Sequence, residues 1–138
     1  MRDWVVRVVL VVWAAVSVQL GVWATFAPRS FYDDYPGFGR AWVRLNGPYN
    51  EHFVRDFGAL NLALAVVTIA ALITLSRPMV IAVAVAWLAW SVPHLVYHLR
   101  HLDVFSTGDK VVNVFLLGSL PVLAVVVLVL TIRRPAQV

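Results

Sequence analysis

The sequence predicts an all-α membrane protein built as an antiparallel bundle of four transmembrane helices. Of its 138 residues, 62% are hydrophobic and 13% are charged, whereas soluble domains average roughly 45–50% and 25%. A soluble fold of this length cannot bury so much apolar surface in a single core. Four apolar segments account for the excess, each near the ~20 residues that a helix needs to cross a bilayer.

These segments belong to one domain, residues 1–138, and a segment in lipid must be helical because its backbone groups have to be paired internally. The connection between the second and third segments is a tight turn, which makes them an antiparallel hairpin. The predicted helices cover about 4–26, 48–75, 79–100 and 111–132.

Residues 28–47 are the long connection, between the first and second helices. They are rich in aromatic residues, glycine and proline, and are too aromatic for a disordered linker. We therefore expect an ordered loop that caps one face of the bundle. The second helix begins either with Gly47 and Pro48, as cap and first-turn proline, or after Asn50 as the cap.

Composition also limits the partners. The chain has no cysteine, which excludes disulfides, iron–sulfur clusters and cysteine nucleophiles. Its net charge is +4, but the basic residues lie at the edges of apolar segments and form no basic stripe, so we expect no nucleic acid. The expected partner is the lipid bilayer, with a membrane protein partner or a homo-oligomer as further options.

The orientation follows from the density of basic residues in short segments. That density places both termini on the cytoplasmic side and the long loop outside. Ten of the eleven basic residues are arginine, and valine and alanine are abundant. This is typical of a protein from a GC-rich bacterial genome, so we expect the bacterial plasma membrane. The basic residues counted on the inner side are Arg2, Arg7, Arg77, Arg133 and Arg134.

The third helix has the most informative polar pattern. At ~100° per residue, Trp90, His94 and His98 share one side of this helix. This side carries an indole ring first and imidazole rings nearer the helix end. Two histidines spaced four residues apart can ligate one metal ion. Core packing for the tryptophan and hydrogen bonding at the membrane surface for the histidines are the alternatives.

The second helix offers a matching polar group near its start. His52 and Asp56 are neighbours one turn apart, and Glu51 and Arg55 occupy the adjoining arc. This helix enters the membrane on the face where the third helix leaves it. The topology alone therefore predicts a polar mouth, rich in histidine and carboxylate, that combines these residues with those of the third helix. A buried ion pair that fixes helix packing is the alternative for Asp56.

Three functions remain open at this stage, and no catalytic residue is predicted. The first is a ligand-binding bundle associated with a membrane redox system, whose mouth holds a metal ion, a haem or a quinone-like head group. The second is an accessory or structural subunit without a site of its own. The third is a metal-dependent membrane enzyme. The predicted metal ligands are His94, His98 and Asp56.

Residues 55–65, with the sequence RDFGALNLALA, carry a resemblance. The segment resembles the second helix of DoxX-like small four-helix membrane proteins, in which a charged pair and a glycine open an apolar helix. Here these residues are Arg55, Asp56 and Gly58. The resemblance implies an antiparallel four-helix bundle, sometimes associated with membrane oxidoreductases and quinones. The loop 31–37 and the histidines of the third helix lie outside the shared pattern.

Overall fold

The computed structural model describes residues 2–133. Residue 1 and residues 134–138, including Arg134 from the orientation count, lie outside the described residues. The predicted all-α fold with four apolar helices of membrane-spanning length is confirmed. These helices are α1 (Arg2–Phe26), α3 (Glu51–Thr74), α4 (Arg77–Arg100) and α5 (Thr107–Ile132).

Local capping determines where two of these helices begin. α3 begins directly after Asn50 rather than near 48, because the Asn50 side chain accepts a hydrogen bond from the Phe53 backbone N–H (3.3 Å). α5 begins before 111, because Ser106 Oγ accepts from the Asp109 backbone N–H (3.2 Å). Both side chains pair amide donors that have no partner within the helix itself.

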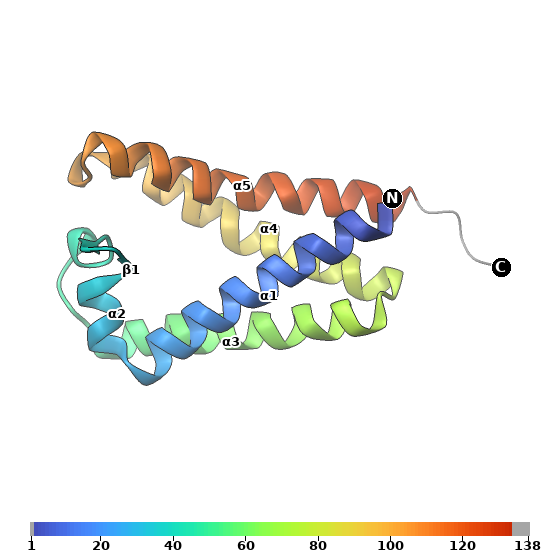
Figure 1. Cartoon of the computed structure of the whole chain (residues 1–138), viewed down its shortest axis with the longest axis horizontal. Helices are drawn as coiled ribbons and strands as arrows, with labels where there is room; N and C mark the ends of the chain where they lie inside the picture. Colours follow the sequence, from blue (N-terminus) through green and yellow to red (C-terminus); the bar gives the residue numbers. More distant parts are fainter. Residues whose placement is uncertain (1, 134–138) are drawn as a thin grey trace.

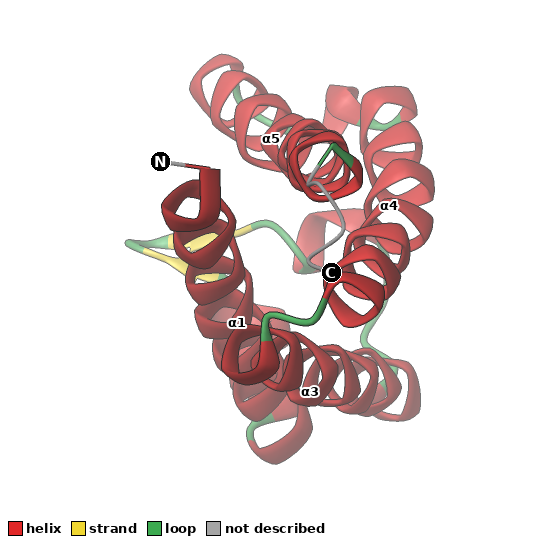
Figure 2. Ribbon diagram, turned by 90° about the vertical axis from the view of Figure 1, so that its right-hand side faces the viewer, coloured by secondary structure: helices red, strands yellow, loops and turns green. Residues whose placement is uncertain are grey.

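The long helices form two packed pairs, α1 with α3 and α4 with α5 (Figure 1). In Figure 1 the sequence colours run in opposite directions along the two helices of each pair. The pairs lie close together where α3 turns into α4, and they separate toward the opposite end (Figure 1). Figure 2 shows the same pairing from the helix ends, with α1 beside α3 and α5 beside α4.

Two glycines allow the backbones of α1 and α3 to approach closely. A Cβ atom at Gly58 would lie 2.6 Å from the backbone nitrogen of Thr25 and 2.9 Å from the carbonyl carbon of Ala24. A Cβ atom at Gly21 would lie 2.9 Å from the backbone nitrogen of Leu62. In lipid, helices associate through such close packing at small residues. α1 and α3 therefore behave as one packed unit.

A tryptophan stack joins the two helix pairs. Trp13 of α1 and Trp87 of α4 are fully buried, and their ring centroids lie 4.7 Å apart with 15° between the ring planes. Trp87 Nε1 donates a hydrogen bond to Thr68 Oγ1 of α3 (3.2 Å). The stack and this hydrogen bond connect three helices at one level of the bundle.

We expect Thr68→Val to lower the thermal stability of the purified protein. The substitution conserves volume but leaves Trp87 Nε1 buried without an acceptor, which costs about 1–3 kcal/mol. Thr74→Val is the matched control, because Thr74 lies exposed on the same helix and donates to Ala70 O. Thermal unfolding in detergent measures both variants, and equal melting temperatures would contradict the expectation.

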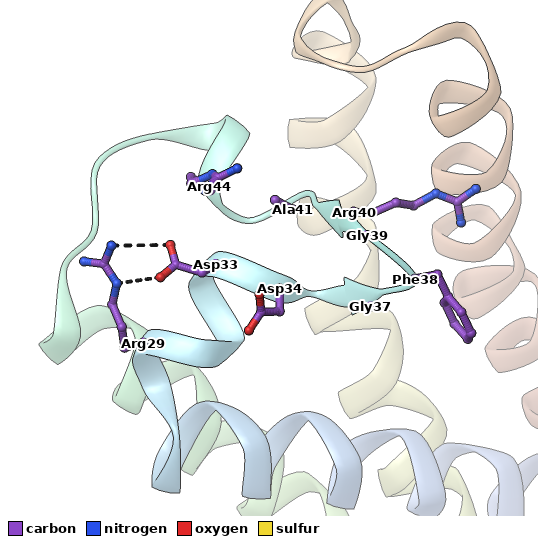
Figure 3. A pocket seen from close by; sticks show the side chains of 9 residues that line it. All are labelled: Arg29, Asp33, Asp34, Gly37, Phe38, Gly39, Arg40, Ala41 and Arg44. Atoms are coloured by element: carbon purple, nitrogen blue, oxygen red, sulfur yellow. Dashed lines mark hydrogen bonds and ion pairs between the residues drawn. The ribbon is translucent and has the colours of Figure 1, made fainter.

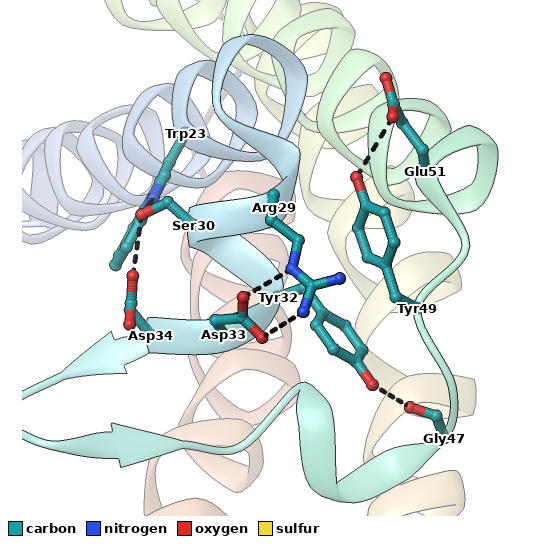
Figure 4. A network of polar contacts seen from close by, with 9 residues as sticks. All are labelled: Trp23, Arg29, Ser30, Tyr32, Asp33, Asp34, Gly47, Tyr49 and Glu51. Atoms are coloured by element: carbon teal, nitrogen blue, oxygen red, sulfur yellow. Dashed lines mark hydrogen bonds and ion pairs between the residues drawn. The ribbon is translucent and has the colours of Figure 1, made fainter.

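The segment between α1 and α3 folds into a cap made of short elements. A hydrogen bond from Tyr32 Oη to Gly47 O (2.7 Å) closes it, and Arg29 pairs with Asp33 (2.6 Å) (Figure 4). A further turn, η2 (Leu102–Val104), follows α4. The elements of the cap are α2 (Pro28–Asp34), β1 (Pro36–Gly37), its antiparallel partner β2 (Arg40–Ala41) and η1 (Arg44–Asn46).

The cap spans both helix pairs at the end where they separate. On the α1–α3 side, Phe31 is buried against Phe57, with ring centroids 5.7 Å apart. On the other side, Arg40 pairs with Asp109 of α5 (2.8 Å). Trp42 packs edge-on against the buried ring of Phe105, just before α5, at 6.0 Å. The cap thus covers the space between the pairs.

Candidate functional site

A cavity of about 610 Å³ lies between the two helix pairs, beneath the cap. All four long helices and the cap contribute to its wall. Aliphatic side chains of α1 and α5 line a large part of it, among them Val16, Leu20, Leu117 and Leu120. The volume falls within the range of about 300–1,000 Å³ that is usual for sites of small organic ligands.

The α4 wall of the cavity consists of aromatic rings. The rings of Trp90 and His94 are stacked, with centroids 5.0 Å apart and 15° between their planes. The ring of His98 follows 4.7 Å from that of His94. A spacing of four residues keeps all three on one helix face, because an α-helix has 3.6 residues per turn. The wall is therefore a flat aromatic surface that ends in two imidazoles.

Five residues that line the cavity each carry a polar atom that is fully buried and has no hydrogen-bond partner in residues 2–133. The indole nitrogens are donors, the amide oxygens are acceptors, and the imidazole nitrogen takes either role according to its tautomer. Buried polar groups are normally paired. The residues that carry these atoms come from α1, the cap, α4 and α5, so they surround the cavity. The atoms are Trp13 Nε1, Trp42 Nε1, Asn46 Oδ1, His98 Nδ1 and Asn113 Oδ1.

The cavity wall is electrically neutral apart from its histidines. Every aspartate, glutamate, arginine and lysine of the described chain lies outside the lining. An ion buried without a partner of opposite charge is costly. The wall therefore suits an uncharged ligand.

Tyr35 lines the cavity from the junction between α2 and β1, and burial raises the pKa of its phenol above the ordinary 10.0. Because the raised pKa belongs to the folded state, the neutral phenol stabilises the protein fully below pH 10, and this contribution is lost as the pH rises through the folded-state pKa. The tyrosinate absorbance is titrated with pH in the wild type and in Tyr35→Phe, and the difference between the two curves is the titration of Tyr35. We expect the midpoint of this difference to lie above pH 10. A midpoint at or below pH 10 would contradict the burial of this phenol.

The structure divides the predicted polar mouth into two separate groups. Trp90, His94 and His98 line the cavity. His52 and Asp56 instead lie on the outer face of α3, where they pair with each other at 3.3 Å and their side chains are 80% and 62% exposed. The prediction rested on the start of α3 and the end of α4 lying at the same membrane face. The side of α3 that carries His52 and Asp56, however, faces away from the cavity.

The neighbouring pair on α3 also lies outside the cavity. Arg55 pairs with Glu51 (2.8 Å) and donates a hydrogen bond to the backbone oxygen of Thr25. These contacts join the start of α3 to the end of α1. Both side chains are about half exposed, so this pair lies at the surface of the bundle.

The predicted metal site with ligands His94, His98 and Asp56 is not formed. Asp56 is engaged with His52 on the outer face of α3. Within residues 2–133, no three side chains of histidine, aspartate or glutamate are placed to hold one metal ion.

A second hollow, of about 540 Å³, lies on the outside of the cap (Figure 3). Two of its arginines already have carboxylate partners: Arg29 pairs with Asp33, and Arg40 pairs with Asp109. Phe38 stands at the hairpin tip beside it and is 96% exposed. The hollow is a surface feature with largely neutralised charge, whereas the inner cavity lies between the helix pairs and has a mainly apolar lining.

The polar residues of the cap and α5 in the cavity wall were not predicted as ligand-binding. Trp42 and Asn46 belong to the cap, and their place opposite α4 depends on contacts distant in sequence. Asn113, in an apolar helix, is the kind of residue that usually hydrogen-bonds to a neighbouring helix. Its oxygen has no such partner in the described chain.

Comparison with known proteins adds no family assignment. No protein-family model, no curated protein and no solved structure matches the chain. The function must therefore be argued from the cavity itself.

Proposed function

We propose that this protein is a membrane protein that binds a neutral, ring-headed, lipid-soluble ligand of the quinone class in the cavity between its helix pairs. The observation that carries the proposal is the combination of an aromatic wall ending in imidazoles and an aliphatic wall in one cavity that no aspartate, glutamate, arginine or lysine of residues 2–133 lines. A quinone has the matching parts: a planar neutral ring, two ring oxygens and an apolar tail.

The aromatic wall suits the ring of such a ligand. Flat rings pack well against one another in offset stacks, and the stacked Trp90 and His94 provide a surface of this kind. No other described residue hydrogen-bonds to the His94 ring. One ring nitrogen of His94 is thus available to a ligand oxygen. The aliphatic side chains of α1 and α5 would accommodate the tail.

Access from the bilayer is supported by two residues that line the cavity and also face outward. Phe53 of α3 is 69% exposed, and Tyr97 of α4 is 45% exposed. They come from different helix pairs, so the cavity wall reaches the outer surface between α3 and α4. A lipid-soluble ligand would reach the cavity laterally by this route.

The wall is less suited to the other ligands considered. Haem carries two propionate groups, and no arginine or lysine of residues 2–133 lines the cavity to pair with them. A catalytic metal ion normally needs three protein ligands, and among the described residues His94 and His98 meet in the cavity without a third histidine or carboxylate beside them. A quinone requires neither feature.

We further propose that the four helices cross the bacterial plasma membrane as an antiparallel bundle, with cytoplasmic termini and the cap outside. The support is the length and apolarity of the helices and the density of basic residues in short inner segments. The resemblance of residues 55–65 to DoxX-like proteins agrees with the proposed ligand class.

A second candidate function is that of an accessory subunit. It is favoured by Phe38, which stands 96% exposed at the tip of the cap hairpin. A large exposed aromatic side chain at such a site is typical of a contact with another protein. Loss of a co-purifying membrane protein in Phe38→Ser would support this candidate.

The test of the ligand proposal is equilibrium binding of a short-tailed benzoquinone to the protein in nanodiscs. Bound quinone is quantified by solvent extraction and chromatography, with protein-free nanodiscs as the control for partition into lipid. We expect additional uptake that saturates at a single quinone per chain. Uptake equal to that of protein-free nanodiscs would contradict the proposal.

A further inference from the structure

We infer that Gln19 of α1 is a second polar contact for the ring of the ligand, in addition to His94. The site therefore prefers 1,4-quinones, whose oxygens lie at opposite ends of the ring, over 1,2-quinones, whose oxygens are adjacent. This inference rests on the proposed function, because it concerns the same cavity. Gln19 lines the cavity and is exposed, and no other described residue forms a hydrogen bond with its amide.

The tryptophan stack shows how α1 and α4 are aligned along the bundle. Trp13 lies thirteen residues before the end of α1 at Phe26, and Trp87 lies thirteen residues before the end of α4 at Arg100. Their ring centroids are 4.7 Å apart. Residues that are equally far from these two helix ends therefore lie at about the same level of the bundle.

Gln19 and His94 share a level that is closer to the cap than the tryptophan stack. Gln19 is seven residues from the end of α1, and His94 is six residues from the end of α4. At 1.5 Å per residue, both lie roughly 10 Å from the ends of their helices. The helix pairs separate in this direction (Figure 1), so α1 and α4 contribute these two residues to separate walls of the cavity.

Gln19 lies at the edge of the α1 wall. It is about 20° around the helix axis from Val12, and both residues line the cavity. Val12 is 46% exposed, whereas Leu20, about 100° further around the helix, is buried. In α5, the cavity-lining Leu116 is 47% exposed. The cavity wall thus reaches the outer surface on the side of α1 and α5, and Gln19 lies at this opening.

An amide at this depth of a transmembrane helix needs a partner, because an unpaired polar group in hydrocarbon is costly. Such side chains usually pair with a neighbouring helix, but Gln19 has no partner in residues 2–133. The other polar side chains of α1 and α5 in the wall differ. Trp13 and Asn113 are buried, and Ser119 Oγ donates to Leu116 O (2.7 Å). Among the described residues of these two helices in the wall, Gln19 combines accessibility with a free N–H donor.

The chemistry of a quinone matches a donor at each end of its ring. A quinone oxygen accepts hydrogen bonds and donates none, whereas an amide N–H group donates. With one oxygen at His94, a 1,4-quinone has its second oxygen at the far end of the ring, toward another wall of the cavity. The oxygens of a 1,2-quinone are adjacent, so only one of the two polar contacts forms. The net gain from one neutral hydrogen bond corresponds to about fivefold in affinity.

The experiment compares the isomers 1,4-naphthoquinone and 1,2-naphthoquinone in nanodiscs. Bound ligand is measured by extraction and chromatography, with protein-free nanodiscs as the control for partition into lipid. The isomers have the same atoms and the same fused rings, so their stacking and apolar burial are closely matched. The chain has no cysteine, so neither isomer is lost to thiol addition. We expect the 1,4 isomer to bind about fivefold more tightly. Equal affinities, or tighter binding of the 1,2 isomer, would overturn the inference.

Variants of Gln19 identify the group responsible. Gln19→Leu and Gln19→Met both remove the amide and retain a side chain of similar size. We expect each variant to bind 1,4-naphthoquinone about fivefold more weakly and 1,2-naphthoquinone nearly as the wild type does. Ser119→Ala is the matched control, because Ser119 also lines the cavity but its hydroxyl already donates within α5. We expect this variant to bind both isomers like the wild type.

The outcomes distinguish this inference from the proposed function. If 1,4-naphthoquinone binds equally well to the wild type and to both Gln19 variants, the inference fails and the quinone-class site stands. If neither isomer binds beyond protein-free nanodiscs, the proposed function fails and the inference fails with it. An amide in a transmembrane helix also pairs with amides of a second chain. A changed oligomeric state of Gln19→Leu in light scattering, at unchanged quinone affinity, would assign the amide to that contact and overturn the inference.

Discussion

Substitution of Gly58 by alanine is expected to destabilise the protein strongly. A Cβ atom at this position would lie 2.6 Å from the backbone nitrogen of Thr25 and would also contact the Thr25 side chain. Backbone atoms cannot rotate away as a flexible side chain does, so α1 and α3 would have to separate. Overpacking of this kind typically costs about 1–3 kcal/mol, and sometimes more.

Gly118→Ala is the matched control for this prediction. Gly118 lies within α5, and a Cβ atom there would have no heavy atom within 4 Å. Alanine at an open helical position is neutral or favourable by about 0.5–1 kcal/mol. We therefore expect a lower melting temperature for Gly58→Ala only, measured by thermal unfolding in detergent. If both variants have the melting temperature of the wild type, α1 and α3 do not pack as described.

Replacement of His94 by leucine is expected to weaken quinone binding at least about tenfold, because it removes a hydrogen-bonding group and a stacking partner together. The His94 ring lies 5.0 Å from Trp90 and 4.7 Å from His98. Leucine conserves apolar volume, so the aliphatic part of the cavity is retained. Equilibrium binding in nanodiscs measures the effect.

His52→Leu provides the control for the histidine substitution. Both histidines belong to the group predicted from the sequence, but the side chain of His52 is 80% exposed on the outer face of α3. We expect wild-type binding in this variant. Equal loss of binding in both variants would mean that the ligand recognises the outer polar group and not the cavity.

The four long helices were predictable because each apolar segment is long enough to cross a bilayer. The starts of α3 and α5 were less predictable, since they depend on which polar side chain caps the first turn. Asn50 and Ser106 do so through hydrogen bonds to backbone N–H groups. In the second helix, Gly47 and Pro48 offered an equally reasonable start from sequence alone.

The candidate site was only partly predictable. Sequence spacing brings Trp90, His94 and His98 onto one face of α4 without any knowledge of the fold. The face of α3 that meets α1 depends on Gly58, and Asp56 lies roughly 200° around the helix from it at 100° per residue. A rotation of this size separates Asp56 from the cavity, although both lie toward the same end of the bundle.

The contributions of the cap and α5 depend on tertiary contacts. Trp42 reaches the cavity because the cap rests on α1 and α3 and pairs across to α5 through Arg40 and Asp109. No local sequence pattern indicates that the cap extends from α1 and α3 to α5. Asn113 is a lone polar residue in an apolar helix, and sequence alone does not distinguish a helix-packing amide from one that lines a cavity.

The most direct test of the central claim is tryptophan fluorescence during titration with a short-tailed quinone in nanodiscs. Trp90 lines the cavity, whereas Trp4 lies exposed near the start of α1. We predict saturable quenching whose amplitude falls in Trp90→Phe and is unchanged in Trp4→Phe. Quenching that rises without saturation, with equal amplitude changes in both variants, would show quinone dissolved in the lipid only and would contradict a binding site between the helix pairs.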